Sequence, residues 1–308
     1  MRLPKLPLRA AYLELDNAPR RNALSLEVLR SLREQLVRYN TPPGESKPLL
    51  LPEFNPDTIR AYSPAGQDTR TQAWSWLADV EEWRKRRGDL PKVLVLRSEG
   101  PVFSAGHDLK EMDKQSPADV EKTFDLCREV MTLMRQSPIP IVGVIQGLAT
   151  AAGAQLALTT DLPVAVASAR FQLPGMSIGL PCTSPSTALS RRLGNAFTYR
   201  MFALAEPVRA DQLPGGAVET VPDGTALEAR VSDIVTKIVS SSGQAQAIGK
   251  WTYWTQAGIQ GPHQGSCGDG YSSAATWAAK AMAIQAGMGD AKEGRKAFME
   301  KRAPSWHT

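Results

Sequence analysis

Cysteine is scarce in this chain, and its scarcity excludes two kinds of protein. Only 3 of the 308 residues are cysteines, Cys127, Cys182 and Cys267, and they lie far apart. This spacing excludes a disulfide-stapled scaffold and a CxxC metal knuckle. Because disulfides are rare in reducing compartments and none is indicated, we expect an intracellular protein. No run of residues approaches the ~20 apolar residues that a membrane-spanning helix needs, so we expect no membrane span.

Histidine and the common cofactor motifs are also scarce. The chain has 3 histidines and contains no HExxH, GxSxG, P-loop or GxGxxG motif. These absences argue against a zinc site, a serine nucleophile on a strand-to-helix elbow and a nucleotide cofactor. We therefore expect neither a metal nor a resident cofactor.

Charge is nearly balanced, with 36 basic and 31 acidic residues. The densest basic cluster, residues 83–87 (WRKRR), is compatible with nucleic acid, but a solvated helix end explains it better. We expect no nucleic-acid partner, and the mild basic excess suits a phosphorylated small molecule. The first nine residues are basic but contain two prolines, and the last five are not a peroxisomal signal. No intact targeting signal is visible, which leaves the mitochondrial matrix and the cytoplasm open.

Apolar patterning predicts an α/β fold. The run at 140–146 (PIVGVIQ) is nearly continuous, which is typical of a buried parallel strand. Ser25 is placed to cap the first helix, with Leu26, Leu29, Leu32 and Leu36 on its apolar face. Strands are also expected at 10–16, 92–97 and 162–167, and a helix at 118–136 with Val120, Phe124, Cys127, Met131 and Met134 in register.

The chain is expected to divide into a core and a helical region. We place the core at 1–205, with an insertion at about 41–90, and a helical C-terminal region at 206–308. Trp74, Trp76 and Trp83 should form the core of the insertion. Because one helix cannot point all three the same way, at least one would be open to a neighbouring subunit. Helices are expected at 188–205, 226–240, 243–258, 271–286 and 290–301.

Two segments of small residues follow strands. The first is 103–110 (FSAGHDLK), and the second is 147–155 (GLATAAGAQ), which ends where a helix starts. Small residues let the backbone approach a ligand, and the N–H groups at a helix start point outward from its positive end. Close packing of helix on sheet explains each segment equally well when it is taken alone.

Three ordered motifs together carry a family resemblance: PRRNAL at 19–24, FSAGHDLK at 103–110 and QGLATAAGAQL at 146–156. Further matches are ARF at 169–171 before Pro174, Ile178-Gly179, and EGRKAFMEKR at 293–302. In this order and spacing they resemble the enoyl-CoA hydratase/isomerase (crotonase) superfamily over nearly the whole chain except the insertion. The stretch ATAAGxQ and the closing KRxPxW resemble one branch, the third enoyl-CoA-hydratase-domain-containing protein of animals and its fungal relatives.

The resemblance implies an acyl-CoA thioester as ligand, with coenzyme A as part of the substrate and not as a cofactor. It implies a spiral of repeated ββα units, followed by helices that mediate a homotrimer or homohexamer. In the family, two backbone N–H groups form an oxyanion hole for the thioester oxygen. Carried over motif by motif, these are the N–H groups of His107 and Ala152. An apolar stripe suited to burial against a partner or within the chain consists of Ala274, Trp277, Ala278, Ala281 and Ile284.

The chain departs from the family's hydratases at both catalytic glutamates. The matching positions hold Gln155 and Gly175. Paired carboxylates act as acid and base when water adds across a double bond, and neither residue can replace them. Gln155 can still hold a water or a carbonyl, and Gly175 either enlarges the pocket or lets the chain turn. An enzyme of another reaction (a thioesterase, decarboxylase or isomerase) and a non-catalytic acyl-CoA binder therefore both stay open.

The motif segments also supply the residues expected to bind coenzyme A. Arg20, Arg21 and Lys110 are cations that can meet its phosphates, although ordinary surface charge is the alternative. The other residues expected at this site are Ala23, Ser104, Ala105, Gly106, Asp108, Leu109, Thr150, Ala151, Pro174 and Leu180.

Four further side chains near these motifs are expected to be structural. Asp108 should shape its loop, Asp161 should stabilise a helix end, and Cys182 should pack as a small residue. The ring of His107 can titrate, but the backbone role of this residue is enough to explain its position.

Overall fold

The computed structural model describes residues 4–57, 74–258 and 289–307. Contacts divide the chain into two compact units. The sheet unit comprises Met1–Arg38, Val93–Arg135 and Pro140–Lys237, and the helical unit comprises Tyr39–Lys92, Gln136–Ile139 and Ile238–Thr308. Each unit combines three segments that are separate in the sequence, because the units are defined by contacts. The division of the chain at residue 205 remains a prediction.

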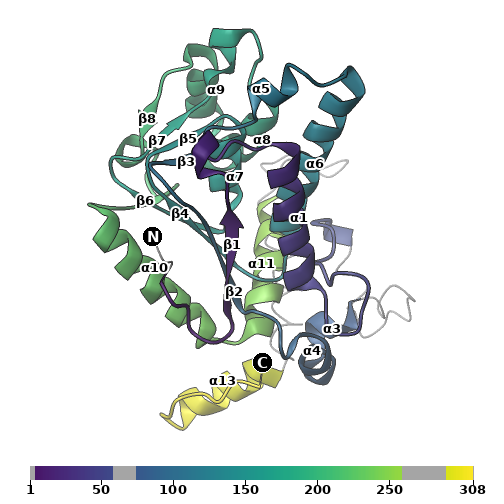
Figure 1. Ribbon diagram of the computed structural model, residues 1–308. Coiled ribbons are helices and arrows are strands. Elements are labelled where there is room, and N and C mark those ends of the chain that lie inside the picture. The colour runs from purple at the N-terminus through teal and green to yellow at the C-terminus, as the bar shows by residue number, and fades with distance from the viewer. Residues whose placement is uncertain (1–3, 58–73, 259–288, 308) are drawn as a thin grey trace, which may run out of the picture. The chain divides into compact units, whose positions relative to one another are not determined.

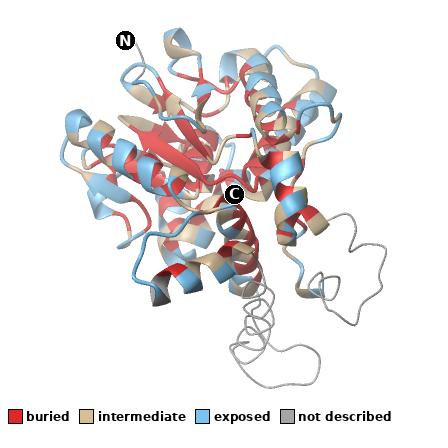
Figure 2. Ribbon diagram, turned by 90° about the horizontal axis from the view of Figure 1, so that it is seen from below, coloured by how far each residue is buried: buried red, intermediate tan, exposed pale blue. Residues whose placement is uncertain are grey.

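The larger sheet of the sheet unit has five parallel strands in the order β1-β2-β4-β6-β9. Its central strand β4 is buried throughout, which explains its continuous apolar run. Figure 2 shows these central strands in red, the colour of buried residues. The strands span Ala10–Leu15 (β1), Val93–Ser98 (β2), Ile141–Ile145 (β4), Leu162–Val166 (β6) and Glu219–Val221 (β9).

A second, smaller sheet has the order β3-β5-β7-β8, in which only β7 and β8 are antiparallel. A strand of the larger sheet, a strand of the smaller sheet and a helix succeed one another three times, as Figure 1 shows. This succession confirms the predicted ββα repeat and the α/β class. The elements are β3 (Val102–Ser104), α5 (Leu109–Met112), α6 (Pro117–Gln136), β5 (Leu148–Thr150), α7 (Ala152–Thr159), β7 (Arg170–Gln172), α8 (Thr183–Leu193) and β8 (Val208–Arg209).

Helix α1 (Leu26–Asn40) begins as the sequence predicts. The hydroxyl of Ser25 accepts a hydrogen bond from the N–H of Val28 at 3.3 Å, and Leu29, Leu32 and Leu36 are fully buried. Helix α6 is also confirmed, but its predicted register is wrong at Phe124, which is 36% exposed. The buried stripe runs instead through Thr123, Cys127, Val130, Met131, Leu133 and Met134.

The predicted helix at 188–205 is two helices. Gly194 has a φ of 81°, a left-handed value that only glycine adopts without strain, and it separates α8 from α9 (Asn195–Leu204). Helix α10 (Gly224–Val239) confirms the helix expected at 226–240. Single-turn helices occupy Ala18–Arg20 (η1), Pro174–Ile178 (η3) and Ala210–Gln212 (η4).

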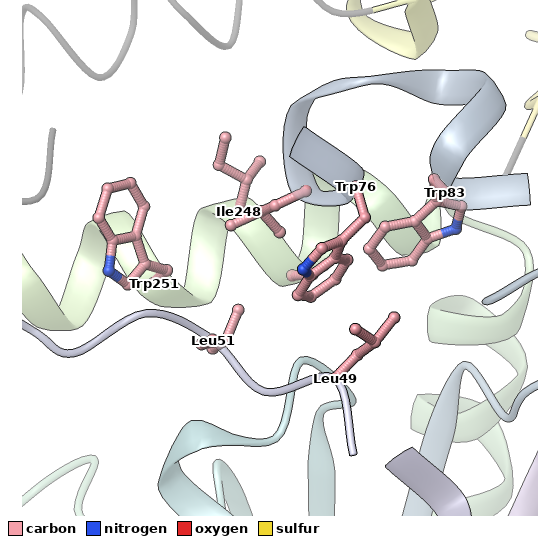
Figure 3. Packing of buried hydrophobic residues seen from close by; sticks show 8 residues of the cluster. Leu49, Leu51, Trp76, Trp83, Ile248 and Trp251 are labelled. Carbon is pink, nitrogen blue, oxygen red and sulfur yellow. The ribbon is translucent and has the colours of Figure 1, made fainter. Parts of the chain in front are cut away.

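The helical unit packs around tryptophan. It contains α3 (Ser75–Ala78), α4 (Val80–Arg87), α11 (Gly243–Ala257) and α13 (Gly289–Met299). Its buried cluster, drawn in Figure 3, consists of Leu49, Leu51, Trp76, Leu77, Trp83, Ala247, Ile248 and Trp251. The helices expected at 243–258 and 290–301 are therefore present, whereas the one at 271–286 and its apolar stripe lie outside the described residues.

Trp76 and Trp83 both lie in this cluster, with their ring centroids 5.7 Å apart. The premise that one helix carries them is wrong, because Asp79 ends α3 and caps α4 by accepting from the N–H groups of Glu81 and Glu82. The break lets both rings face the same core. The basic cluster at 84–87 is the last turn of α4, and its Arg87 is buried over both rings.

Candidate functional site

The segment 17–24 is fixed onto the loop that carries the second motif by one buried asparagine. The side-chain amide of Asn22 donates to the carbonyls of Glu99 and Val102, both at 2.8 Å. In return, the hydroxyl of Ser104 donates to the carbonyl of Asn22 at 2.8 Å. Asn22 has a φ of 53°, a left-handed conformation that asparagine tolerates better than most residues. Sequence reasoning gave Asn22 no role, and this tolerance is the only signal that could have suggested one.

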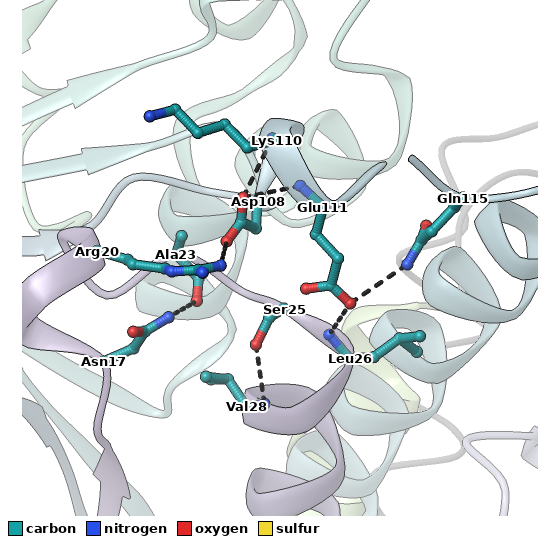
Figure 4. A network of polar contacts seen from close by, with 10 residues as sticks. All are labelled: Asn17, Arg20, Ala23, Ser25, Leu26, Val28, Asp108, Lys110, Glu111 and Gln115. Atoms are coloured by element: carbon teal, nitrogen blue, oxygen red, sulfur yellow. Dashed lines mark hydrogen bonds and ion pairs between the residues drawn. The ribbon is translucent and has the colours of Figure 1, made fainter. Parts of the chain in front are cut away.

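Asp108 shapes its loop, as expected (Figure 4). One carboxylate oxygen accepts from the N–H groups of Lys110 and Glu111, which caps α5, and the other lies 2.8 Å from the guanidinium of Arg20. Burial raises the pKa of Asp108, but the hydrogen bonds from Arg20 and from the two N–H groups outweigh burial, and the pKa is lowered overall. Arg20 thus ties the first motif to the second, while Arg21 and Lys110 are exposed.

The two small-residue segments meet backbone to backbone. Gly106 has a φ of +79°, and a Cβ there would lie 2.9 Å from the carbonyl oxygen of Thr150 and 3.4 Å from the backbone nitrogen of Ala152. A Cβ on Gly153 would lie 2.6 Å from the carbonyl oxygen of Ser104. Only glycine fits at these two contacts. The structure therefore brings together the segments around His107 and Ala152.

The backbone at this junction leaves two N–H groups without acceptors in the described part of the chain. Ala151 has φ 49° and ψ −122°, a strained conformation that turns the chain directly into α7, and its own N–H donates to Gln172. Ala152 is then the first residue of the helix, where an N–H has no partner within the helix. Within the described ranges, neither the N–H of Ala152 nor that of His107 donates to a protein acceptor.

The imidazole of His107, the residue that carries one of these donors, is half-buried. Its ring packs edge-on against Phe124 of α6, with the centroids 5.0 Å apart. Burial lowers the pKa of His107, and a hydrogen bond with the backbone of Leu24 partly opposes this. Its Nδ1 and the hydroxyl of Thr150 are buried polar atoms with no hydrogen-bond partner in the part of the chain that the structure describes.

Gln155 is buried on α7 in a neutral environment. Its amide nitrogen lies 3.4 Å from the hydroxyl of Thr187, and its amide oxygen lies 3.4 Å from that of Ser184, both on α8. These are long contacts between uncharged groups. The cluster can hold a polar atom, but it holds no proton that titrates near neutral pH.

Gly175 does not enlarge a pocket, because atoms of Leu180 and Cys182 fill the space that a side chain would occupy. A Cβ there would lie 2.0 Å from the carbonyl oxygen of Leu180 and 2.8 Å from both the backbone nitrogen and the sulfur of Cys182. The turn is closed by the N–H of Leu180, which donates to the carbonyl of Gly175 at 2.9 Å. Of the two roles expected for Gly175, the structure supports the turn.

The remaining expectations concern structural groups. Asp161 accepts from the N–H of Ile141 at 2.8 Å and so joins the end of α7 to β4, as expected. Cys182 is buried, and burial raises the pKa of its thiol while a hydrogen bond from Gly175 lowers it. No group of histidine, cysteine and acidic residues in the described ranges could hold a metal ion. None of the helices in those ranges is long and apolar enough to cross a membrane.

Of the other expected site residues, the contact between the second and third motifs brings together Ser104, Gly106, Thr150 and Ala151. The N–H of Ala105 donates instead to the carbonyl of Arg21 in the first motif, at 3.0 Å. Ala23 is buried within the first motif, and Leu109 is exposed on α5. Pro174 and Leu180 belong to the turn around Gly175.

Known proteins resemble this chain along most of its length. A family profile described as enoyl-CoA hydratase/isomerase matches residues 81–308. The mitochondrial enoyl-CoA hydratase domain-containing protein 3 of Rattus norvegicus is 33% identical over 294 residues, which cover 95% of this chain and 79% of the relative.

Solved structures agree with that match. The human enoyl coenzyme A hydratase domain-containing protein 3 superposes with a TM-score of 0.73 at 29% identity, covering 97% of this chain and 98% of that one. An enoyl-CoA hydratase of Mycobacterium smegmatis superposes with a TM-score of 0.74 at 31% identity, covering 99% and 98%. With its ββα repeat and its motifs in order, the chain belongs to the enoyl-CoA hydratase/isomerase (crotonase) family, in the branch of domain-containing protein 3.

Proposed function

We propose that the chain binds an acyl-CoA thioester and holds its carbonyl oxygen with the backbone N–H groups of His107 and Ala152. One observation carries this proposal: both N–H groups lack an acceptor among the residues that the structure describes, and they belong to segments that touch at Gly106. Fixed donors of this kind stabilise an enolate oxygen without having to reorganise, and the loss of one donor typically slows a reaction about 10²–10³-fold.

Coenzyme A would lie along the first two motifs. Arg21 and Lys110 are exposed cations that can meet its phosphates, whereas Arg20 already pairs with Asp108 and would hold the loop as much as the ligand. The other residues assigned to this surface are Ala23, Ser104, Ala105, Gly106, Leu109, Thr150, Ala151, Pro174 and Leu180.

Ordinary hydration of an enoyl-CoA is not the reaction we expect. The site offers a neutral amide at Gln155, and the turn at Gly175 leaves no room for a second carboxylate. Hydration needs groups that activate water and protonate carbon. Reactions that use the oxyanion hole without two carboxylates fit better: isomerisation, thioester hydrolysis or decarboxylation.

A second candidate function is that of an acyl-CoA-binding protein or regulatory subunit that catalyses no reaction. The neutral contacts of Gln155 with two hydroxyl groups favour it, because they resemble a binding cluster more than a catalytic one. Binding and chemistry therefore have to be measured separately.

Calorimetric titration with acetoacetyl-CoA tests the binding claim, and crotonyl-CoA hydration tests the reaction claim. We expect binding together with a hydration rate far below that of a two-glutamate hydratase. Failure of any acyl-CoA to bind at millimolar concentration would remove the proposal. A hydration rate equal to that of such a hydratase would show that our interpretation of Gln155 and Gly175 is wrong.

We also propose assembly as a homotrimer or homohexamer. Several large apolar side chains of the sheet unit are exposed on η3, the turn after it and α9: Met176, Ile178, Leu180, Tyr199 and Leu204. Burying such side chains against other copies is favourable. Light scattering should report a multiple of 33.4 kDa at micromolar concentration, and a monomer would contradict the proposal. Relatives named as mitochondrial favour the mitochondrial matrix as the location, which imaging of the tagged protein would test.

A further inference from the structure

One titratable group of the site has no role in the scheme above. The imidazole of His107 is half-buried, and its buried Nδ1 has no hydrogen-bond partner among the described residues. A buried polar atom without a partner destabilises the fold unless something else requires it. The hydroxyl of Thr150, in the segment that contacts Gly106, is a second atom of this kind. One atom belongs to the residue that offers the first N–H, and the other lies two residues before the second, and neither N–H has an acceptor among the described residues. Such a group of atoms indicates a place where a ligand completes the hydrogen bonding.

We propose that the imidazole of His107 is the acid–base group of the acyl site and moves a proton at the carbon beside the thioester carbonyl. This inference rests on the proposed function and names its reaction. A short covalent path joins Nδ1 to the backbone nitrogen of the same residue. If that N–H holds the thioester oxygen, the carbon beside the carbonyl would bind next to the residue that carries this ring.

The other titratable groups at the site are already committed. The carboxylate of Asp108 caps α5 and pairs with Arg20. Burial raises the pKa of the Cys182 thiol, so this group stays protonated at neutral pH and offers no thiolate to accept a proton. Positions 155 and 175 carry no ionisable side chain. Among the described residues at this site, His107 is the group left to exchange a proton near neutral pH.

The surroundings of His107 keep it in its basic form. Burial lowers its pKa from the ordinary value of 6.5, and a hydrogen bond with the backbone of Leu24 opposes this shift. Phe124 packs against the ring from α6, where Glu121 and Arg128 lie one turn away on either side. Neither of these charges, nor the Arg20–Asp108 pair, contributes to the shift. The free base therefore dominates at neutral pH.

The chemistry balances with one group and no added reactant. The neutral Nδ1 takes a proton from the α-carbon of a 3-enoyl-CoA, and the electron pair of the broken C–H bond moves onto the thioester oxygen, which the two N–H groups stabilise. The imidazolium, whose proton can exchange with water, then gives a proton to the γ-carbon, and the product is the conjugated 2-enoyl-CoA. The implied substrate class is a 3-enoyl thioester, because a proton shift needs one base, whereas hydration needs a water and a second group.

The experiment uses the full chain with 3-hexenoyl-CoA and measures both the absorbance of the conjugated product and deuterium uptake from heavy water. His107→Gln keeps the backbone N–H and a polar side chain but cannot titrate. His107→Phe keeps an aromatic ring against Phe124. His307→Gln, in the helical unit, is the control. We expect the first two variants to lose about 10²–10⁴-fold in rate while still binding acyl-CoA, and the control to keep full activity.

The outcomes separate this inference from the proposed function. If no acyl-CoA binds the parent, the proposed function fails. If acyl-CoA binds but the parent neither isomerises nor exchanges, or if His107→Phe keeps the parent's rate, only the inference fails. The parent's pH profile decides the matter if both variants misfold. The rate should rise through a single ionisation below pH 6.5, and a profile that is flat from acidic to neutral pH would overturn the assignment.

Discussion

The turn at Gly175 gives the sharpest prediction of the structure. In Gly175→Ala, the new Cβ would be placed 2.0 Å from the carbonyl oxygen of Leu180 and 2.8 Å from two atoms of Cys182. Ordinary contacts need more than 3 Å, so the turn must open by more than 1 Å. No positive φ is involved at Gly175, and the obstacle is therefore steric alone.

The cost can be worked from two parts. Overpacking of this kind destabilises by about 1–3 kcal/mol. Loss of the closing hydrogen bond from Leu180 to Gly175 adds about 0.5–1.5 kcal/mol. The sum is about 1.5–4.5 kcal/mol, which for a unit of this size lowers the melting temperature by about 3–18 °C.

Thermal unfolding of parent and variant, with acyl-CoA titration at a low temperature, is the assay. The matched control is Gly215→Ala in the same unit, where a Cβ meets nothing within 4 Å and φ is not positive, so the change should stay within about 0.5 kcal/mol. An unchanged melting temperature for Gly175→Ala would refute the steric reasoning. The same clash bears on restoring the lost acids: Gln155→Glu with Gly175→Glu should destabilise the turn instead of creating a working hydratase.

Three further predictions follow. Gln155→Glu alone places a carboxylate in a neutral, buried cluster, so it should destabilise by about 1–3 kcal/mol and give no crotonyl-CoA hydration; a hydration rate well above the parent's would contradict this. Asp108→Ala removes the cap of α5 and should cost about 0.5–2 kcal/mol by urea unfolding at neutral pH, with little added by the pair to Arg20, whose side chain is 65% exposed. Because the pKa of Asp108 is lowered by folding, its contribution is present above its ordinary value of 3.8 and is lost as the pH falls further; parent and variant should therefore converge in acid, and a constant difference would count against the assignment. Trp76→Ala should lower the free energy of unfolding by about 3–5 kcal/mol. The control Tyr253→Ala, at a residue that is 58% exposed, should change it by less than about 0.5 kcal/mol. Equal effects of the two substitutions would contradict the tryptophan core.

Long elements were predictable from the sequence because burial leaves a pattern over several residues. The continuous apolar run at 140–146 indicates a strand buried on both faces, and the leucines of α1 follow a helical period. The structure buries both sets of side chains. Strands β7, β8 and β9 have only two or three residues, too few for any period to show. The break at Gly194 depends on one residue with a positive φ inside a helix-like pattern, which the pattern alone could not reveal.

The candidate site was predictable only in part, for a related reason. The motifs place His107 and Ala152 in small-residue segments, and the resemblance gives them a role. Their contact through Gly106, by contrast, depends on two loops that are distant in the sequence. Leu180 and Cys182 fill the space beside position 175 only in the folded turn. The hydrogen bonds of Asn22 to the loop of the second motif likewise form only in the folded chain.

The central claim is that the N–H groups of His107 and Ala152 hold a thioester oxygen, and a crystal structure with bound acetoacetyl-CoA tests it most directly. The account predicts the thioester oxygen at about 2.7–3.1 Å from both backbone nitrogens. A thioester oxygen bound elsewhere, or N–H groups turned toward protein acceptors with the ligand in place, would contradict it.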